Sequence, residues 1–167
     1  MSDRIFAVVD TNVLVSALIS KSIESNPMKV FRAIVTERIV PLYNDEILQE
    51  YRSVLSREKF HLDKTLIVTV LKAIVTDGLC LDRTPAVDAE FPDPKDIVFY
   101  EIALSKEDSY LITGNIKHFP IRPNAAVAID GSIKYRVSEV LIAVLLLKFG
   151  FQAIESSITK ISFNALI

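Results

Sequence analysis

Four acidic residues stand far apart in the chain, at positions where the end of a strand or a helix would present them. Asp10 follows the apolar run 5–9, Glu50 lies in a predicted helix, and Asp93 and Asp96 open a later helix. Carboxylates gathered from several segments around one point repel one another, and a hard cation such as Mg²⁺ or Mn²⁺ allows them to coexist. The four acids therefore predict metal-dependent chemistry.

Three of these acids also have a purely structural interpretation. Asp10 is a good N-cap for a helix that begins near Asn12. Asp93 and Asp96 fit the N-cap and the first turn of the helix that follows them. If Asp10 does bind a metal ion, the small polar side chains of Thr11 and Asn12 could hydrogen-bond its carboxylate or a metal-bound water.

Glu50 is harder to explain by helix capping. Glu46, one turn earlier, lies in the first turn, where the helix dipole favours acids, but Glu50 lies beyond it. At about 100° per residue, Glu50 is about 100° from the centre of the apolar stripe at Tyr51, and Glu46 is about 140° from it. Glu50 thus borders the stripe and is the preferred site residue. The alternative is a solvated Glu50 paired with Arg52 or Arg57.

A further polar group follows a predicted strand that ends at Thr113. Asn115 could be a ligand or a water-positioning residue supported by the Thr113 hydroxyl, or the pair could simply form a turn. Glu101, within an apolar helix, could support the site or face solvent. His61 and His118 are isolated in the sequence, which disfavours zinc. Motifs of other enzyme classes, such as a glycine-rich phosphate loop, are not evident.

Composition favours one folded domain over residues 1–167, since half of the residues are hydrophobic. The net charge of −2 provides no strong global field for nucleic acid, so RNA binding would need a local basic patch or a bridging metal. Cys80, the single cysteine, lies in an apolar run and is predicted to be a buried free thiol in a reducing cytoplasm. We expect no signal peptide and no membrane span, because charged residues interrupt the apolar runs.

Strand and helix patterns alternate along the chain. The predicted strands are 5–9, 39–43, 79–81, 109–113 and 125–129, and the predicted helices are 12–20, 26–37, 45–56, 63–78, 93–105 and 137–149. This order predicts an α/β fold in which helices cover both faces of a mostly parallel sheet of four to five strands. The functional crevice is expected beyond the carboxyl ends of the strands, where Asp10, Asn44 and Asn115 lie.

Four segments carry a resemblance to a known family. In chain order they are VVDTNVLVSAL (8–18), ILQEY (47–51), FPDPKD (91–96) and YLITGNIKHFP (110–120). Together they resemble PIN-domain proteins, in particular toxin components of toxin–antitoxin systems, over a core of about residues 5–120. The resemblance implies a three-layer α/β/α sandwich and a cytoplasmic Mg²⁺- or Mn²⁺-dependent ribonuclease with a cognate antitoxin.

The resemblance also assigns roles. It makes Asp10, Glu50 and Asp96 metal ligands and Asp93 an accessory acid, and it places Asn115 where many members have a fourth Asp. Lys95 and Ile97 also stand where relatives often carry acids. These departures motivate the alternative of a catalytically weakened PIN domain that binds RNA or a protein.

Further expectations concern contacts. Lys117, Arg52 and Arg122 lie near the motifs and could contact the RNA backbone. The C-terminal helix 137–149 and the tail to residue 167 could form a homodimer or antitoxin contact, or could be buried in the core. A metal-dependent phosphatase is disfavoured, because Asn12 replaces the second Asp that such enzymes use.

Overall fold

The computed structural model describes residues 4–86, 90–107, 109–115 and 118–119, and beyond these the backbone of three further strands between residues 126 and 143. The strands are β1 (Ile5–Val9), β2 (Ile39–Tyr43), β3 (Leu79–Cys80), β4 (Ser109–Ile112), β5 (Ala126–Ile129), β6 (Ser132–Val137) and β7 (Val140–Ala143). The helices are α1 (Thr11–Leu18), α2 (Asn26–Val35), α3 (Asp45–Leu55), α4 (Lys64–Asp77) and α5 (Ile97–Leu104), with the short 3₁₀-helices η1 (Glu58–Phe60) and η2 (Pro94–Asp96).

These strands form one sheet in the order β3-β2-β1-β4-β7-β6-β5. The neighbours from β3 through β7 are parallel, whereas β7, β6 and β5 are joined by antiparallel pairing. The predicted mostly parallel α/β sandwich is confirmed. The antiparallel extension makes the sheet longer than the four to five strands expected.

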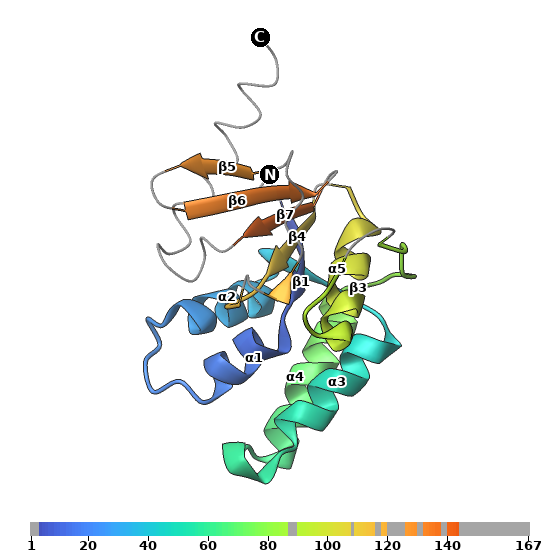
Figure 1. The fold of residues 1–167 in the computed structure, drawn as a ribbon. Coiled ribbons are helices and arrows are strands. Elements are labelled where there is room, and N and C mark those ends of the chain that lie inside the picture. The colour runs from blue at the N-terminus through green and yellow to red at the C-terminus, as the bar shows by residue number, and fades with distance from the viewer. Residues whose placement is uncertain are drawn as a thin grey trace.

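The central strand β1 explains why helices must cover both faces of the sheet. Its successive residues Ala7, Val8 and Val9 point to alternating faces, and all three are buried. Helix α5 packs against β1 and β4 on one side, and α1 and α2 lie on the other side (Figure 1). An almost continuous apolar run such as 5–9 is the pattern of a parallel strand covered on both faces.

Helix starts follow their capping residues. Asn44 accepts a hydrogen bond from Ile47 N at 2.9 Å, and Asp63 accepts from Thr65 N at 2.7 Å, so the caps predicted for α3 and α4 are confirmed. In α2, Asn26 followed by Pro27 is the sequence pattern of an N-cap and a first helical residue, but Ser25 adopts the extended cap conformation and Asn26 is already helical. None of the described helices is long and apolar enough to cross a membrane.

Two predictions about single elements were wrong. The predicted helix 137–149 is replaced over Val140–Ala143 by β7, because strand pairing with β4 and β6 overrides the helical spacing of its apolar residues; residues 144–149 lie outside the described part. Cys80 is a free cysteine but is exposed rather than buried. It belongs to β3, a two-residue strand that pairs on one side with β2 and lies at the edge of the sheet.

Gly78 ends α4 as predicted, but its backbone is not in the left-handed conformation that commonly makes glycine necessary there. The reason is a close approach of two backbone segments. A Cβ on residue 78 would lie 2.3 Å from the carbonyl oxygen of Ile74 and 2.7 Å from that of Pro41. Glycine therefore allows the end of α4 to pass directly beside β2.

We expect Gly78→Ala to lower the free energy of unfolding by about 1–3 kcal/mol, because two backbone segments would have to separate to accept the added methyl group. Urea unfolding measures the loss. Thr76→Ala, an exposed position on the same helix, is the matched control and should change stability little. Equal stability of the two variants would contradict the close approach.

Candidate active site at the carboxyl edge of the sheet

Asp10 stands where β1 ends and α1 begins, and it is only 6% exposed. Its Oδ1 accepts a hydrogen bond from the backbone N–H of Asn12 at 3.0 Å, so it is the N-cap of α1. Its Oδ2 accepts a bond from the Thr113 hydroxyl at 2.6 Å, across the junction of β1 and β4. The carboxylate is thus both a cap and a fixed, buried acid at the carboxyl edge. Asn12 supports it through its backbone, since the Asn12 side chain is exposed.

Glu50 reaches the same region from α3. Its Oε1 accepts a hydrogen bond from the hydroxyl of Thr11 at 2.7 Å, and Thr11 is itself buried. Within the described residues Glu50 forms no ion pair with Arg52 or Arg57, so the solvated-pair alternative is wrong. The predicted position of Glu50 at the border of the apolar stripe explains how a half-buried carboxylate can face a crevice.

Asp96 is the last residue of η2 and leads into α5. Its Oδ2 lies 2.8 Å from Nδ1 of His118, a residue that the sequence presents as isolated. Asp93 is the N-cap of η2, where its Oδ1 accepts a bond from Lys95 N at 2.9 Å. The capping interpretation of Asp93 is confirmed, and His118 is a site residue that sequence reasoning missed.

The pKa values indicate that three of these acids influence one another. Burial raises the pKa of Glu50, and the charges of Asp96 and Asp10 raise it further, against the opposing hydrogen bond from Thr11. Burial likewise raises the pKa of Asp96, with contributions from the charges of Asp10 and Asp93, while the bond to His118 lowers it. Asp10, Glu50 and Asp96 therefore lie close enough to repel one another.

Tyr51 is the buried neighbour of these acids. It is buried, and its hydroxyl donates a short hydrogen bond to the carbonyl oxygen of Val9, the residue before Asp10. Burial raises its pKa well above the ordinary value, and the charges of Asp10 and Glu50 add to this effect. Tyr51 thus stays neutral and ties α3 to the end of β1.

The carboxylates of Asp10, Glu50 and Asp96 are donors of the chemical type that a hard divalent cation prefers. They come from three different elements, and a positive ion between them would offset the repulsion that raises the pKa values of Glu50 and Asp96. In the described part of the chain no three acidic or histidine side chains already form a closed ligand set.

The segment around Asn115 is a turn, as its structural interpretation predicts. Asn115 N donates to the Thr113 hydroxyl at 3.0 Å, and its carbonyl oxygen accepts from His118 N at 3.2 Å. The turn thereby joins Thr113, which holds Asp10, to His118, which contacts Asp96. Its backbone bonds give Asn115 a positioning role whatever its side chain does.

Of the three predicted RNA contacts, the structure describes only Arg52. Arg52 lines a separate groove beside α3, and it is about 160° around the helix axis from Glu50. Lys117 and Arg122 lie outside the described residues. Two residues along a helix nearly reverse the direction of a side chain, so Arg52 does not share the side of α3 that carries Glu50. Its contact with RNA stays a prediction.

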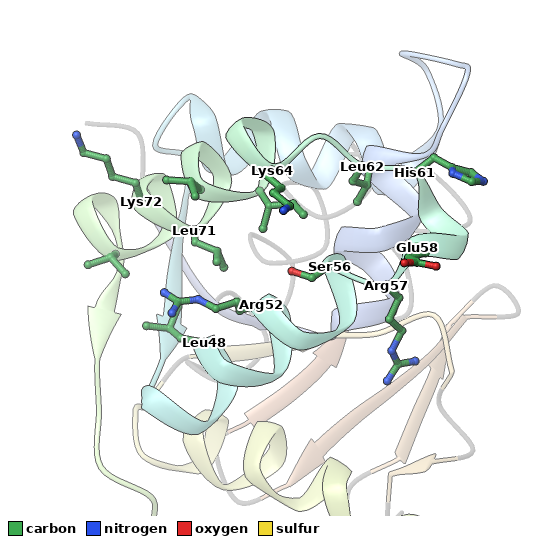
Figure 2. Close-up of a pocket in the computed structure, with 13 residues that line it drawn as sticks. Leu48, Arg52, Ser56, Arg57, Glu58, His61, Leu62, Lys64, Leu71 and Lys72 are labelled. Carbon is green, nitrogen blue, oxygen red and sulfur yellow. The ribbon is translucent and has the colours of Figure 1, made fainter.

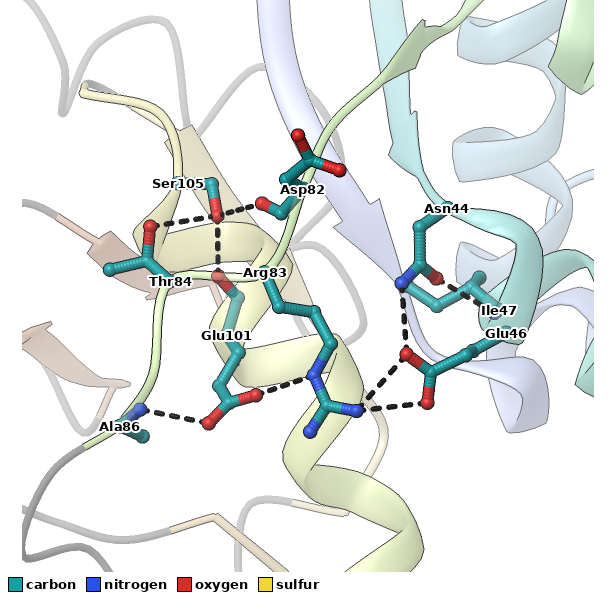
Figure 3. A network of polar contacts seen from close by, with 9 residues as sticks. All are labelled: Asn44, Glu46, Ile47, Asp82, Arg83, Thr84, Ala86, Glu101 and Ser105. Carbon is teal, nitrogen blue, oxygen red and sulfur yellow. Dashed lines mark hydrogen bonds and ion pairs between the residues drawn. The ribbon is translucent and has the colours of Figure 1, made fainter.

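A polar network links α3, which carries Glu50, to α5, which directly follows Asp96 (Figure 3). Arg83 Nε donates to Glu101 Oε2 at 2.6 Å, and Arg83 Nη1 donates to both carboxylate oxygens of Glu46 at 2.9 and 3.0 Å. The other oxygen of Glu101 accepts from Ala86 N at 2.8 Å. Glu101 is buried, so its solvent-facing alternative is wrong, and Arg83 fixes the spacing of α3 and α5.

Parallel strands, covering helices and a group of carboxylates at the carboxyl edge define an α/β protein with an acidic candidate site. A family model described as PIN domain matches residues 7–117, more than half of the chain, and the protein belongs to the PIN-domain family. PIN domains have a nuclease-type fold, and they typically use divalent metals. No curated protein and no solved structure matches the chain.

The raised pKa of Glu50 predicts a specific pH dependence. The folded state binds the proton of the Glu50 carboxyl more tightly than the unfolded chain does. Without metal, the free energy of unfolding therefore falls as the pH rises from the ordinary pKa of 4.5 through the raised pKa of the folded state. In EDTA, we expect Glu50→Gln to reduce this fall and to be more stable than wild type at neutral pH. Urea unfolding between about pH 4.5 and 7.5 tests this. The exposed Glu58→Gln is the control, and an unchanged slope in Glu50→Gln would contradict the repulsion.

The Arg83 network predicts a double-mutant cycle. Arg83→Met leaves the buried Glu101 carboxylate without its cation and should cost about 2–3 kcal/mol of unfolding free energy. Arg83→Met/Glu101→Met removes both charges and should recover part of that loss. Urea unfolding of the four proteins measures the coupling. If the losses of unfolding free energy in Arg83→Met and in Glu101→Met simply add in the double variant, the network does not join the helices as described.

Proposed function

We propose that this PIN-domain protein is a divalent-metal-dependent endoribonuclease that hydrolyses phosphodiester bonds in RNA and acts as the toxin of a toxin–antitoxin pair. One observation carries the catalytic part: a buried Asp10 at the carboxyl end of β1 lies near Glu50 and Asp96, and its charge helps to raise the pKa of both. A site of this kind is better suited to binding a cation than to holding the fold together.

Asp10, Glu50 and Asp96 would hold Mg²⁺ or Mn²⁺. The chemistry supplied by such an ion is a lowered pKa of its bound water and compensation of the phosphate's negative charge. Hydrogen bonds from Thr113 and from the backbone N–H of Asn12 orient Asp10, and the Thr11 hydroxyl orients Glu50. These donors occupy part of the lone-pair capacity of each carboxylate and leave the rest for a metal.

The remaining residues would position the reaction. His118 contacts one oxygen of Asp96, and this contact fixes the direction of the Asp96 carboxylate. Asp93 or Asn115 would orient the attacking water, either Asp93 with the carboxylate oxygen that does not cap η2 or Asn115 with its side-chain amide. These two roles come from the family's motif order.

A second candidate function is a catalytically weakened PIN domain that binds RNA or protein. A specific observation favours it: the charge of Lys95 lowers the pKa of Glu50, so a fixed cation already lies near the acids. Lys95 therefore supplies part of the compensation that a metal would otherwise provide. The neutral Asn115 and Ile97, where relatives often carry acids, point the same way.

The partners follow from the family resemblance. RNA would be the substrate, and a cognate antitoxin encoded in an adjacent reading frame would neutralise the enzyme in the cytoplasm. Self-association as a homodimer is part of the same proposal. Inspection of the neighbouring frame for a short DNA-binding protein tests the antitoxin, and light scattering of the purified chain tests the dimer.

Asp10→Asn should lower Mn²⁺-dependent cleavage of single-stranded RNA by at least about a hundredfold, because it removes a charged ligand. Asparagine keeps the α1 N-cap, so the variant should stay folded. Asp45→Asn, at an exposed position in the first turn of α3, is the matched control. Robust cleavage by Asp10→Asn would overturn the assignment.

Calorimetric titration with Mn²⁺ distinguishes the two candidate functions. The nuclease requires saturable binding to wild type that Asp10→Asn weakens. A wild-type protein that binds no Mn²⁺ but retains RNA would support the weakened domain instead.

A further inference from the structure

A large groove lies between α3 and α4, and none of Asp10, Glu50 and Asp96 lines it (Figure 2). Its volume is about 1220 Å³, above the range of about 300–1,000 Å³ usual for small-molecule pockets. Leu48 and Arg52 of α3 line it, and both are about 160° around the helix axis from Glu50. The groove therefore belongs to a different face of the molecule from the candidate active site.

The floor of the groove is apolar and partly open to solvent. Ile67 and Leu71 form its buried base, while Val68 is 64% exposed and Val75 is 47% exposed. These four residues recur at helical spacing along one side of α4. From residue 64 to residue 75 this side is about 16 Å long, which matches three turns of a second helix laid beside it.

The rim of the groove is basic. Arg52, Arg57, Lys64 and Lys72 line it, against one acid, Glu58. Among the described residues no carboxylate forms an ion pair with any of these four cations. A surplus of positive charge around an apolar floor, on a chain whose net charge is −2, calls for negative charge from outside.

We propose that this groove is the docking site for an acidic amphipathic helix of a partner protein. The apolar side of the helix would cover Val68, Leu71 and Val75, and its acidic residues would reach Arg52 and Lys64. Helix-in-groove recognition of this kind needs apolar anchors spaced as the floor of the groove is spaced. RNA fits less well, because phosphates would engage the rim but leave the exposed valines uncovered.

Selection from a display library of helix-forming 18-residue peptides on the full chain tests the proposal. The selected peptides should be amphipathic and acidic, and fluorescence anisotropy should show at least about tenfold weaker binding to Val68→Glu/Val75→Glu and to Lys64→Glu/Lys72→Glu. These positions are exposed, so the variants should fold as wild type, which circular dichroism checks. Val35→Glu, an exposed valine of α2 outside the groove, is the matched control and should bind normally.

Three results would overturn the proposal. The first is a selection that yields no peptide sensitive to the groove variants, or peptides that are not acidic. The second is displacement of bound peptide by short single-stranded RNA, which would make the groove a nucleic-acid site. The third is a wild-type oligomer, seen by light scattering, that Val68→Glu/Val75→Glu converts to monomer, since the occupant would then be a second copy of this chain.

Discussion

Repulsion between partly buried carboxylates is the constraint around which the rest of this structure is arranged. Asp10, Glu50 and Asp96 come from three elements, and burial together with neighbouring charge raises the pKa of Glu50 and Asp96, which makes the ionised forms of these two costly. The short bonds from the Thr11 and Thr113 hydroxyls offset part of this cost and fix the direction of two carboxylates. Because repulsion between the carboxylates remains despite these hydrogen bonds, a bound cation would stabilise the site.

Much of the fold could be predicted because its determinants are local. The apolar run before Asp10 and the caps Asn44 and Asp63 each act within a few residues, so strand and helix starts were read correctly. Gly78 was identified as a helix end, but the reason, a close approach to Pro41, depends on a strand far away in the chain. The strand at 140–143 was missed for the same reason, since pairing with β4 and β6 decides it.

The candidate site divides in the same way. Its acids could be found from the sequence because Asp10 follows a strand, Asp93 and Asp96 open a helix, and Glu50 borders the apolar stripe of α3. His118 and Arg83 could not be found, because they act through contacts 18 or more residues away in sequence. Charged side chains far apart in a chain carry no local pattern that says which will meet, so the Arg83 link between α3 and α5 is visible only in three dimensions.

Helix α3 joins these observations, because it presents different chemistry on its different sides. One side places Glu50 near Asp10 and Asp96, and the buried Tyr51 anchors the helix to the end of β1. The opposite side carries Leu48 and Arg52 to the basic groove. The anchor and the Arg83 link hold the helix rigidly against the core, so a partner in the groove would meet a fixed surface. A helix so constrained can serve a metal site and a docking surface together, since neither requires it to move.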